Sequence, residues 1–142
     1  MSHTYSNLLT HTIFSTHERT PLITDNIRDD LYSYLGGIVR ELRGTALAIG
    51  GTRDHVHMLL KLPCNLAIAD CLRVVKTNSS RWVHETWPER LLFGWQIGYG
   101  AFSVSESGHL RVVAYIRQQE KHHRKMSFRE EFFAVAQTWG SF

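Results

Sequence analysis

The sequence predicts an α+β protein of the ferredoxin-like, or RRM-like, class, with an antiparallel βαββαβ sheet and additional helical segments at the C-terminus. Three observations lead to this class. Strand-like and amphipathic helical segments follow one another in the order strand, helix, strand, strand, helix, strand. The two central strands are joined by a short glycine-containing turn, so they form a hairpin. The length of 142 residues suits one domain, which we assign to residues 1–142.

The first strand and the first helix lie in the N-terminal third of the chain. Residues 5–16 are rich in β-branched and aromatic types, which favour a strand. After a polar turn, Thr24 and Asp25 can cap a helix that runs to about Leu42. A pair of glycines inside this helix weakens it without interrupting its pattern. The apolar residues that recur at three- and four-residue steps are Ile27, Leu31, Tyr34, Leu35, Ile38 and Leu42.

The predicted hairpin and the second helix follow. Residues 44–50 form a strand, residues 50–54 a turn, and His55–Leu62 a further strand that Pro63 ends. The second helix covers roughly Leu66–Thr86. One face of this helix carries Ile68, Leu72, Val75, Ser79 and Trp82.

The C-terminal part is predicted to add one strand and two helices. Residues 93–104 form the fourth strand, whose glycines indicate bends or close backbone approach. Glu106–Lys125 is predicted to be a third long helix, and Phe128–Gln137 a short fourth one. In a sheet of this order the two crossover helices lie on one face, so we expect the opposite face to be available for a ligand.

Composition narrows the class of protein but not its activity. The 16 Lys and Arg against 13 Asp and Glu give a formal charge of +3, which is compatible with nucleic acid but is a weak signal. Cys64 and Cys71 match no zinc or redox spacing, and Cys71 is predicted to be a small core residue. The sequence has neither a secretory leader pattern nor a stretch of about 20 apolar residues. We therefore expect a cytoplasmic protein without disulfides.

Two histidines flank one apolar residue in the segment DHVHMLLKL. Side chains alternate along a strand, so His55 and His57 project from one face while Val56 points to the other. Such a pair can hold one metal ion and leave coordination positions open, or it can be an ordinary pair of exposed or cross-strand histidines. Zinc would need further protein ligands that are absent nearby, whereas magnesium or manganese would accept oxygen ligands and phosphate.

The third predicted helix offers a possible oxygen ligand and a nucleophile. Tyr115 and Gln119 lie four residues apart on one face, and His122 falls on that face as well. Leu110 and Val113 lie on roughly the opposite side and are predicted to anchor the helix to the core. A phenol facing a metal site can be a nucleophile if it is activated. The alternative is a half-buried structural tyrosine beside a surface glutamine.

The second helix carries small polar residues and two cations in the segment KTNSSRW. Lys76 and Arg81 are candidates for contact with nucleic-acid phosphates, whereas Trp82 is predicted to be in the core. The other interpretation of this segment is a solvated helix face.

Together these segments resemble the single-tyrosine HUH transposases, the small transposases of simple bacterial insertion sequences and their REP-associated relatives. "HUH" denotes His-hydrophobe-His, matched by His55-Val56-His57, and the family's Tyr-x-x-x-Gln is matched by Tyr115 and Gln119. Flanking segments also resemble the family: HTIFSTHERTPLI, KTNSSRW, FGWQIGYGAFSVSES and YIRQQEKHHRKMSFREEF. The resemblance covers nearly the whole chain.

The resemblance implies a transposase that cuts and rejoins single-stranded DNA at insertion-sequence ends marked by imperfect hairpins. It implies that His55, His57 and Gln119 hold a divalent ion, Mg²⁺ or Mn²⁺, and that Tyr115 on a C-terminal catalytic helix forms a 5′-phosphotyrosine intermediate. It further implies a homodimer, in which the tyrosine helix of one subunit can complete the histidine site of the other. The role of His122 stays open between proton transfer, DNA phosphate binding and support of the metal site.

Two other functions compete with this interpretation. A domesticated regulator could keep the fold and bind DNA without cutting it, although it would not need His55, His57, Tyr115 and Gln119 together. An unrelated metallohydrolase could use the histidine pair, but it would have no use for the tyrosine.

Overall fold

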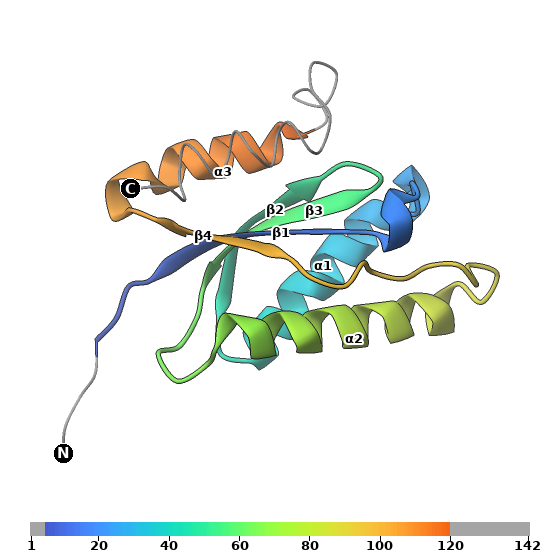
Figure 1. The fold of residues 1–142 in the computed structure, drawn as a ribbon, viewed down its shortest axis with the longest axis horizontal. Helices are drawn as coiled ribbons and strands as arrows, with labels where there is room; N and C mark the ends of the chain where they lie inside the picture. Colours follow the sequence, from blue (N-terminus) through green and yellow to red (C-terminus); the bar gives the residue numbers. More distant parts are fainter. Residues whose placement is uncertain (1–4, 120–142) are drawn as a thin grey trace.

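The computed structural model describes residues 5–119 and contains a four-stranded sheet of order β2-β3-β1-β4 (Figure 1). All three strand pairs are antiparallel. In chain order the elements are β1 (Leu9–Ser15), η1 (His17–Arg19), α1 (Asp25–Glu41), β2 (Thr45–Gly51), β3 (His55–Lys61), α2 (Ile68–Thr86), β4 (Gly100–Val104), η2 (Glu106–Gly108) and α3 (His109–Arg117). This order and pairing confirm the predicted ferredoxin-like class.

The helices lie on both faces of the sheet. Figure 1 shows α1 and α2 below the sheet and α3 above it. The prediction that the face opposite the two crossover helices is left open is therefore wrong. Within residues 5–119, α3 covers part of that face and packs on β2 and β3. The described helices include none that is long and apolar enough to span a membrane.

Alternation along the strands divides the core into two clusters. On β3, Val56, Met58 and Leu60 point toward α1 and α2 and belong to the larger cluster. Leu59 points the other way and packs with Val112 and Ile116 of α3. His55 and His57 have the parity of Leu59, so the alternation of β3 directs both rings toward α3.

The ends of α1 are set by an N-cap threonine and by a left-handed turn after its last residue. Its N-cap is Thr24, as predicted, and its last residue is Glu41. Arg43 then adopts a left-handed conformation with φ 66°, and the amide of Gly44 donates to the carbonyl of Val39. This C-terminal turn reverses the chain directly into β2.

Two predicted elements differ from the structure. The fourth strand was predicted from residue 93, but β4 begins at Gly100 and only an isolated bridge joins Trp95 to Thr16. The positive φ of Gly98, 96°, lies outside the extended region and prevents a continuous strand. The predicted third helix begins as the 3₁₀ turn η2, and α3 itself ends at Arg117, with Gln118 as its C-cap at φ −108° and ψ 25°. Residues 120–125 of that prediction lie outside the described residues. The fourth predicted helix, 128–137, lies outside the described residues.

Candidate functional site

The two histidines of the HUH segment lie at the start of β3, which is paired on one side with β1 and on the other with β2. Both His55 and His57 are fully buried. Their ring centroids are 5.1 Å apart, and the planes meet at 66°. The strand therefore places both imidazoles together on the face covered by α3, as the alternation predicted.

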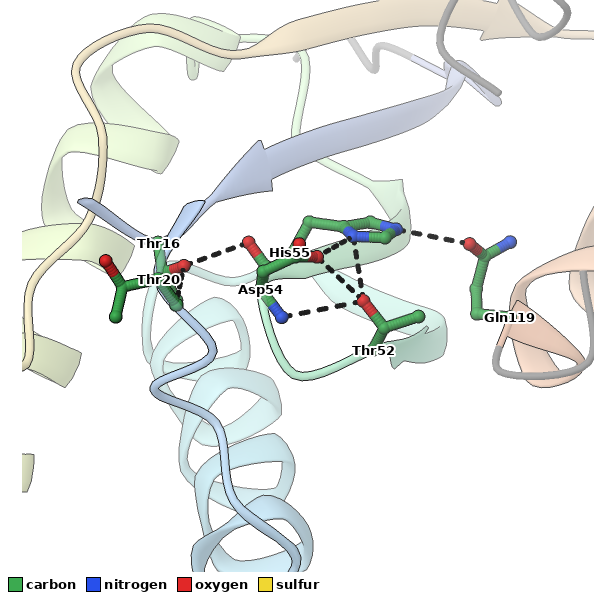
Figure 2. Close-up of polar contacts among 6 residues, drawn as sticks. All are labelled: Thr16, Thr20, Thr52, Asp54, His55 and Gln119. Carbon is green, nitrogen blue, oxygen red and sulfur yellow. Dashed lines mark hydrogen bonds and ion pairs between the residues drawn. The ribbon is translucent and has the colours of Figure 1, made fainter. Parts of the chain in front are cut away.

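The orientation of His55 is fixed by the turn that precedes it (Figure 2). Nδ1 of His55 lies 2.7 Å from Oδ1 of Asp54 and 2.9 Å from Oγ1 of Thr52. The Thr52 hydroxyl donates to that same Asp54 oxygen at 2.9 Å, so its proton is already used. Nδ1 therefore lies between two acceptors and is the nitrogen that carries the proton. In neutral His55 the lone pair is consequently on Nε2.

Nε2 of His55 faces the side-chain oxygen of Gln119, 3.4 Å away (Figure 2). The Gln119 amide nitrogen donates to the carbonyl of Tyr115 at 3.2 Å, which assigns the amide oxygen to the histidine side. Gln119 is 1% exposed. Two buried acceptors that face each other are favourable only with a cation between them, which is either a proton or a metal ion.

The donor chemistry fits a divalent metal ion. Two imidazole nitrogens and one amide oxygen are ligands that magnesium or manganese accepts together with phosphate oxygens. Among residues 5–119, no three or more His, Cys, Asp and Glu side chains form a metal-binding group. Among these described residues, Gln119 places its amide oxygen beside His55 and could supply a third protein ligand.

Tyr115 lies beside the histidine pair. Its ring is edge-on to that of His57, with centroids 6.0 Å apart and an interplanar angle of 72°. Its place opposite Leu110 and Val113 on the helix predicted that this tyrosine faces away from the core. That prediction is wrong, since its ring is half-buried and packs against the smaller cluster, which contains Val112 and Ile116. The structure thus brings Tyr115, Gln119, His55 and His57 together.

The packing of α3 on the sheet differs in detail from the prediction. Val112 and Ile116 are buried, Val113 packs beside them, and Leu110 is 73% exposed. Leu110 was therefore wrongly predicted to be a core anchor. Which face of α3 packs on the sheet depends on the close approach of the backbone of Ile116 to β2. The spacing of apolar residues within the helix does not predict this contact.

His11 on β1 is a site residue that the sequence analysis missed. Its Nε2 lies 2.8 Å from Nδ1 of His57, and both rings are fully buried. Its ring centroid is 6.4 Å from that of Tyr115. The strand pattern could have placed His11 on the same buried face as the apolar Leu9 and Ile13, but it could not have placed it beside His57.

The structure does not bring the two predicted DNA-contacting cations to the histidine pair, because α2 lies on the opposite face of the sheet. The Lys76 amine donates to the carbonyl of Gln96 at 2.9 Å and also to that of Gly98. Burial lowers the pKa of Lys76 from its ordinary value. Arg81 is exposed and donates to the side chain of Asn78. His122 lies outside the described residues.

Comparison with known proteins identifies relatives over most of the chain. The sequence model of the family described as "Transposase IS200 like" matches residues 4–119. The ISDra2 transposase TnpA of Deinococcus radiodurans is 27% identical over 114 residues, which cover 77% of this chain and 81% of that protein.

Two solved structures share the fold. A candidate transposase from Deinococcus radiodurans R1 superposes with a TM-score of 0.66 at 24% identity, covering 82% of this chain and 94% of that one. A REP-associated tyrosine transposase bound to a REP hairpin superposes with a TM-score of 0.56 at 17% identity, covering 82% and 70% of the two chains.

Proposed function

The chain belongs to the IS200-like transposase family, and we propose that it cleaves and rejoins single-stranded DNA through a covalent link between Tyr115 and a 5′ phosphate. The observation that carries the proposal is the meeting of four side chains beneath α3: His55, His57, Tyr115 and Gln119. Each comes from a position that the family resemblance assigns, and they converge although 64 residues separate His55 from Gln119.

We propose that the histidine pair and Gln119 hold Mg²⁺ or Mn²⁺. His55 would use Nε2, since its Nδ1 carries the proton shared with Asp54. His57 would also use Nε2, since its Nδ1 contacts His11. When bound, the ion would polarise a phosphoryl oxygen and align the DNA backbone for in-line attack.

The phenol oxygen of Tyr115 is the proposed nucleophile. It attacks the phosphorus as its own proton leaves, the bond to the 3′ oxygen breaks, and that oxygen takes up a proton to become a 3′ hydroxyl. The reverse reaction of another 3′ hydroxyl with the phosphotyrosine rejoins the strands. Because the phosphoester energy is kept in the covalent link, neither step requires ATP.

The surroundings of Tyr115 limit the directions in which its ring can point. His57 stands against the ring edge at 6.0 Å, and the backbone carbonyl of Tyr115 is tied to the Gln119 amide. Restricting a nucleophile in this way lowers the entropy cost of reaching the attack geometry. The same contacts couple the position of the tyrosine to two of the three proposed ligands, His57 and Gln119.

We also propose that the DNA partner carries a hairpin. One structure that shares this fold is that of a transposase bound to a REP hairpin. Arg81 is exposed and can contact DNA phosphates, whereas the Lys76 amine is held by loop carbonyls and is the weaker candidate. A homodimer, with or without shared sites, remains a prediction from the family resemblance.

The covalent intermediate provides the test. A 3′-labelled single-stranded oligonucleotide carrying an imperfect palindrome, chosen from the DNA that flanks the gene and incubated with the protein and Mg²⁺, is expected to give a labelled protein band on denaturing electrophoresis. Tyr115→Phe should abolish the band. Tyr34→Phe is the matched control, because the Tyr34 ring stacks on Trp82 at 4.3 Å on the other side of the sheet and should keep that contact.

The outcome separates the proposed enzyme from a non-cleaving DNA-binding regulator. Binding of the oligonucleotide without any covalent band, in wild type and Tyr34→Phe alike, would favour the regulator. A band that persists in Tyr115→Phe would assign the nucleophile to another residue.

A further inference from the structure

His11 contacts the candidate metal site from the neighbouring strand. In the β1–β3 register, Ile13 is opposite His57 and His11 is opposite Leu59, so His11 and His57 are diagonal neighbours on one face. Their ring nitrogens are 2.8 Å apart and their ring centroids 5.0 Å apart. A polar contact of this length between two fully buried imidazoles restrains both rings.

The protons in this contact follow from the role of His57. A ring nitrogen that binds a metal uses its lone pair, so Nε2 of a neutral His57 can bind metal only if the ring proton is on Nδ1. That Nδ1–H then donates to Nε2 of His11, which must be an acceptor. The tautomer of His11 that suits this contact has its own proton on Nδ1.

We propose that His11 is a positioning residue, whose Nε2 accepts the Nδ1–H of His57 and thereby holds Nε2 of His57 toward the metal. This inference rests on the proposed function, because it assumes that His57 is a ligand. Metal-bound histidines usually donate their second ring N–H to a carboxylate, a carbonyl or a water, and such partners hold the ring and its tautomer. Here His11 supplies that acceptor on the β1 strand.

The two proposed histidine ligands thus have different partners. His55 donates to the Asp54 carboxylate in the turn before β3, whereas His57 donates to a neutral imidazole. Of these two partners, Asp54 alone adds negative charge, and it does so on the His55 side. The ring of His11 also stands edge-on to that of Tyr115, so one side chain contacts both a proposed ligand and the proposed nucleophile.

Metal affinity tests this inference without relying on DNA cleavage. Mn²⁺ binding would be measured by titration calorimetry on the Tyr115→Phe protein, with and without a second change at His11. We expect His11→Leu to weaken Mn²⁺ binding about 10–100-fold, the usual effect of losing such a partner. His11→Gln should restore most of the affinity, since a glutamine oxygen can occupy the place of Nε2. His17→Leu is the control, because the His17 side chain is 63% exposed.

The controls separate failure of this inference from failure of the proposed function. If His55→Ala abolishes Mn²⁺ binding and His11→Leu binds as tightly as the parent, the role of His11 is overturned and the metal site stands. If the Tyr115→Phe protein with an unchanged His11 binds no Mn²⁺, the role of His11 and the proposed metal site are both overturned.

A second measurement does not depend on the folding of any His11 variant. Imidazole nitrogen NMR on the Mg²⁺-loaded Tyr115→Phe protein should show His57 with its proton on Nδ1. Finding that proton on Nε2 would overturn the inference.

Discussion

Burial separates the two cysteines of this chain. Cys71 on α2 is fully buried in the larger core cluster, as the sequence predicted, whereas Cys64 is exposed. Burial raises the pKa of the Cys71 thiol from 9.0 to about 11, because the thiolate cannot be hydrated there. In the unfolded chain the same thiol ionises near its ordinary value.

This difference predicts a loss of stability at alkaline pH. Above about pH 9 the unfolded chain loses the Cys71 proton while the folded chain keeps it, so the free energy of unfolding falls as the pH rises to about 11. Urea unfolding at pH 8, 9 and 10, in a Cys64→Ser background, should show a steeper fall for the parent than for Cys71→Ala. Equal pH dependence in the two proteins would contradict the assignment.

The reaction centre could be predicted from sequence where its partners lie close in the chain or match the family. His55 and His57 share a face because a strand alternates, and Tyr115 and Gln119 are one turn apart. His11 could not be found in this way, since it pairs with a residue 46 positions away and its contact exists only once β1 lies beside β3. The sequence contains nine histidines, and composition alone does not distinguish this one.

A glycine on β2 determines how closely α3 lies on the sheet. A Cβ at Gly50 on β2 would lie 2.2 Å from the carbonyl oxygen of Ile116, closer than any two such atoms can approach. Ile116 follows the proposed nucleophile directly. A side chain at position 50 must therefore push α3 away from the sheet and displace Tyr115 and Gln119 with it.

We expect Gly50→Ala to impair the reaction far more than the fold. A displacement of about 1 Å in a reacting group can cost on the order of 100-fold in rate, so formation of the covalent DNA band should fall by that order. Gly36→Ala is the matched control, since its Cβ would meet Ile49 at an ordinary 3.6 Å in the middle of α1. That control should leave the band unchanged and raise stability by up to about 1 kcal/mol.

The measurements are the yield of covalent adduct and the thermal midpoint of each variant. Retention of full adduct formation in Gly50→Ala would show that α3 does not have to lie this close to β2 during the reaction.

The regular elements were predictable to different degrees for physical reasons. Both ends of the first helix were predicted correctly, because its regular apolar spacing stops at Leu42. The left-handed turn at Arg43 follows directly. The fourth strand was predicted too long, because Trp95 and Tyr99 favour a strand while the backbone of Gly98 excludes one. The face that α3 turns toward the sheet depends on its contact with Gly50. That contact joins distant parts of the chain, so the local sequence pattern of the helix does not predict it.

The sheet separates two packing layers of the molecule. The larger cluster with α1 and α2 lies on one face, and a smaller cluster with α3 lies on the other with the histidines. Within one chain, α3 lies over its own β2 and β3, so one chain supplies all four proposed reaction residues.

This arrangement predicts that two defective chains do not complement each other. A mixture of His57→Ala and Tyr115→Phe proteins should give no covalent DNA band, because every chain lacks one part of its own site. The mixture would be refolded together from denaturant, so that any dimers contain both chains, and assayed with the labelled oligonucleotide. A mixture of wild type and Tyr115→Phe is the positive control. Recovery of the band by complementation would establish sites shared between subunits.

The alternation of β3 also limits how the gene can change in length. Deleting one residue between Val56 and Leu60 would shift one part of β3 by one position relative to the other. Either the side chains after the deletion or the histidines before it would then change face, which places aliphatic side chains toward α3 or imidazoles in the larger cluster. Folding and chemistry would then be lost in a single event. The irregular segment that joins α2 to β4 carries no such parity, so insertions and deletions among descendants of this sequence should accumulate there.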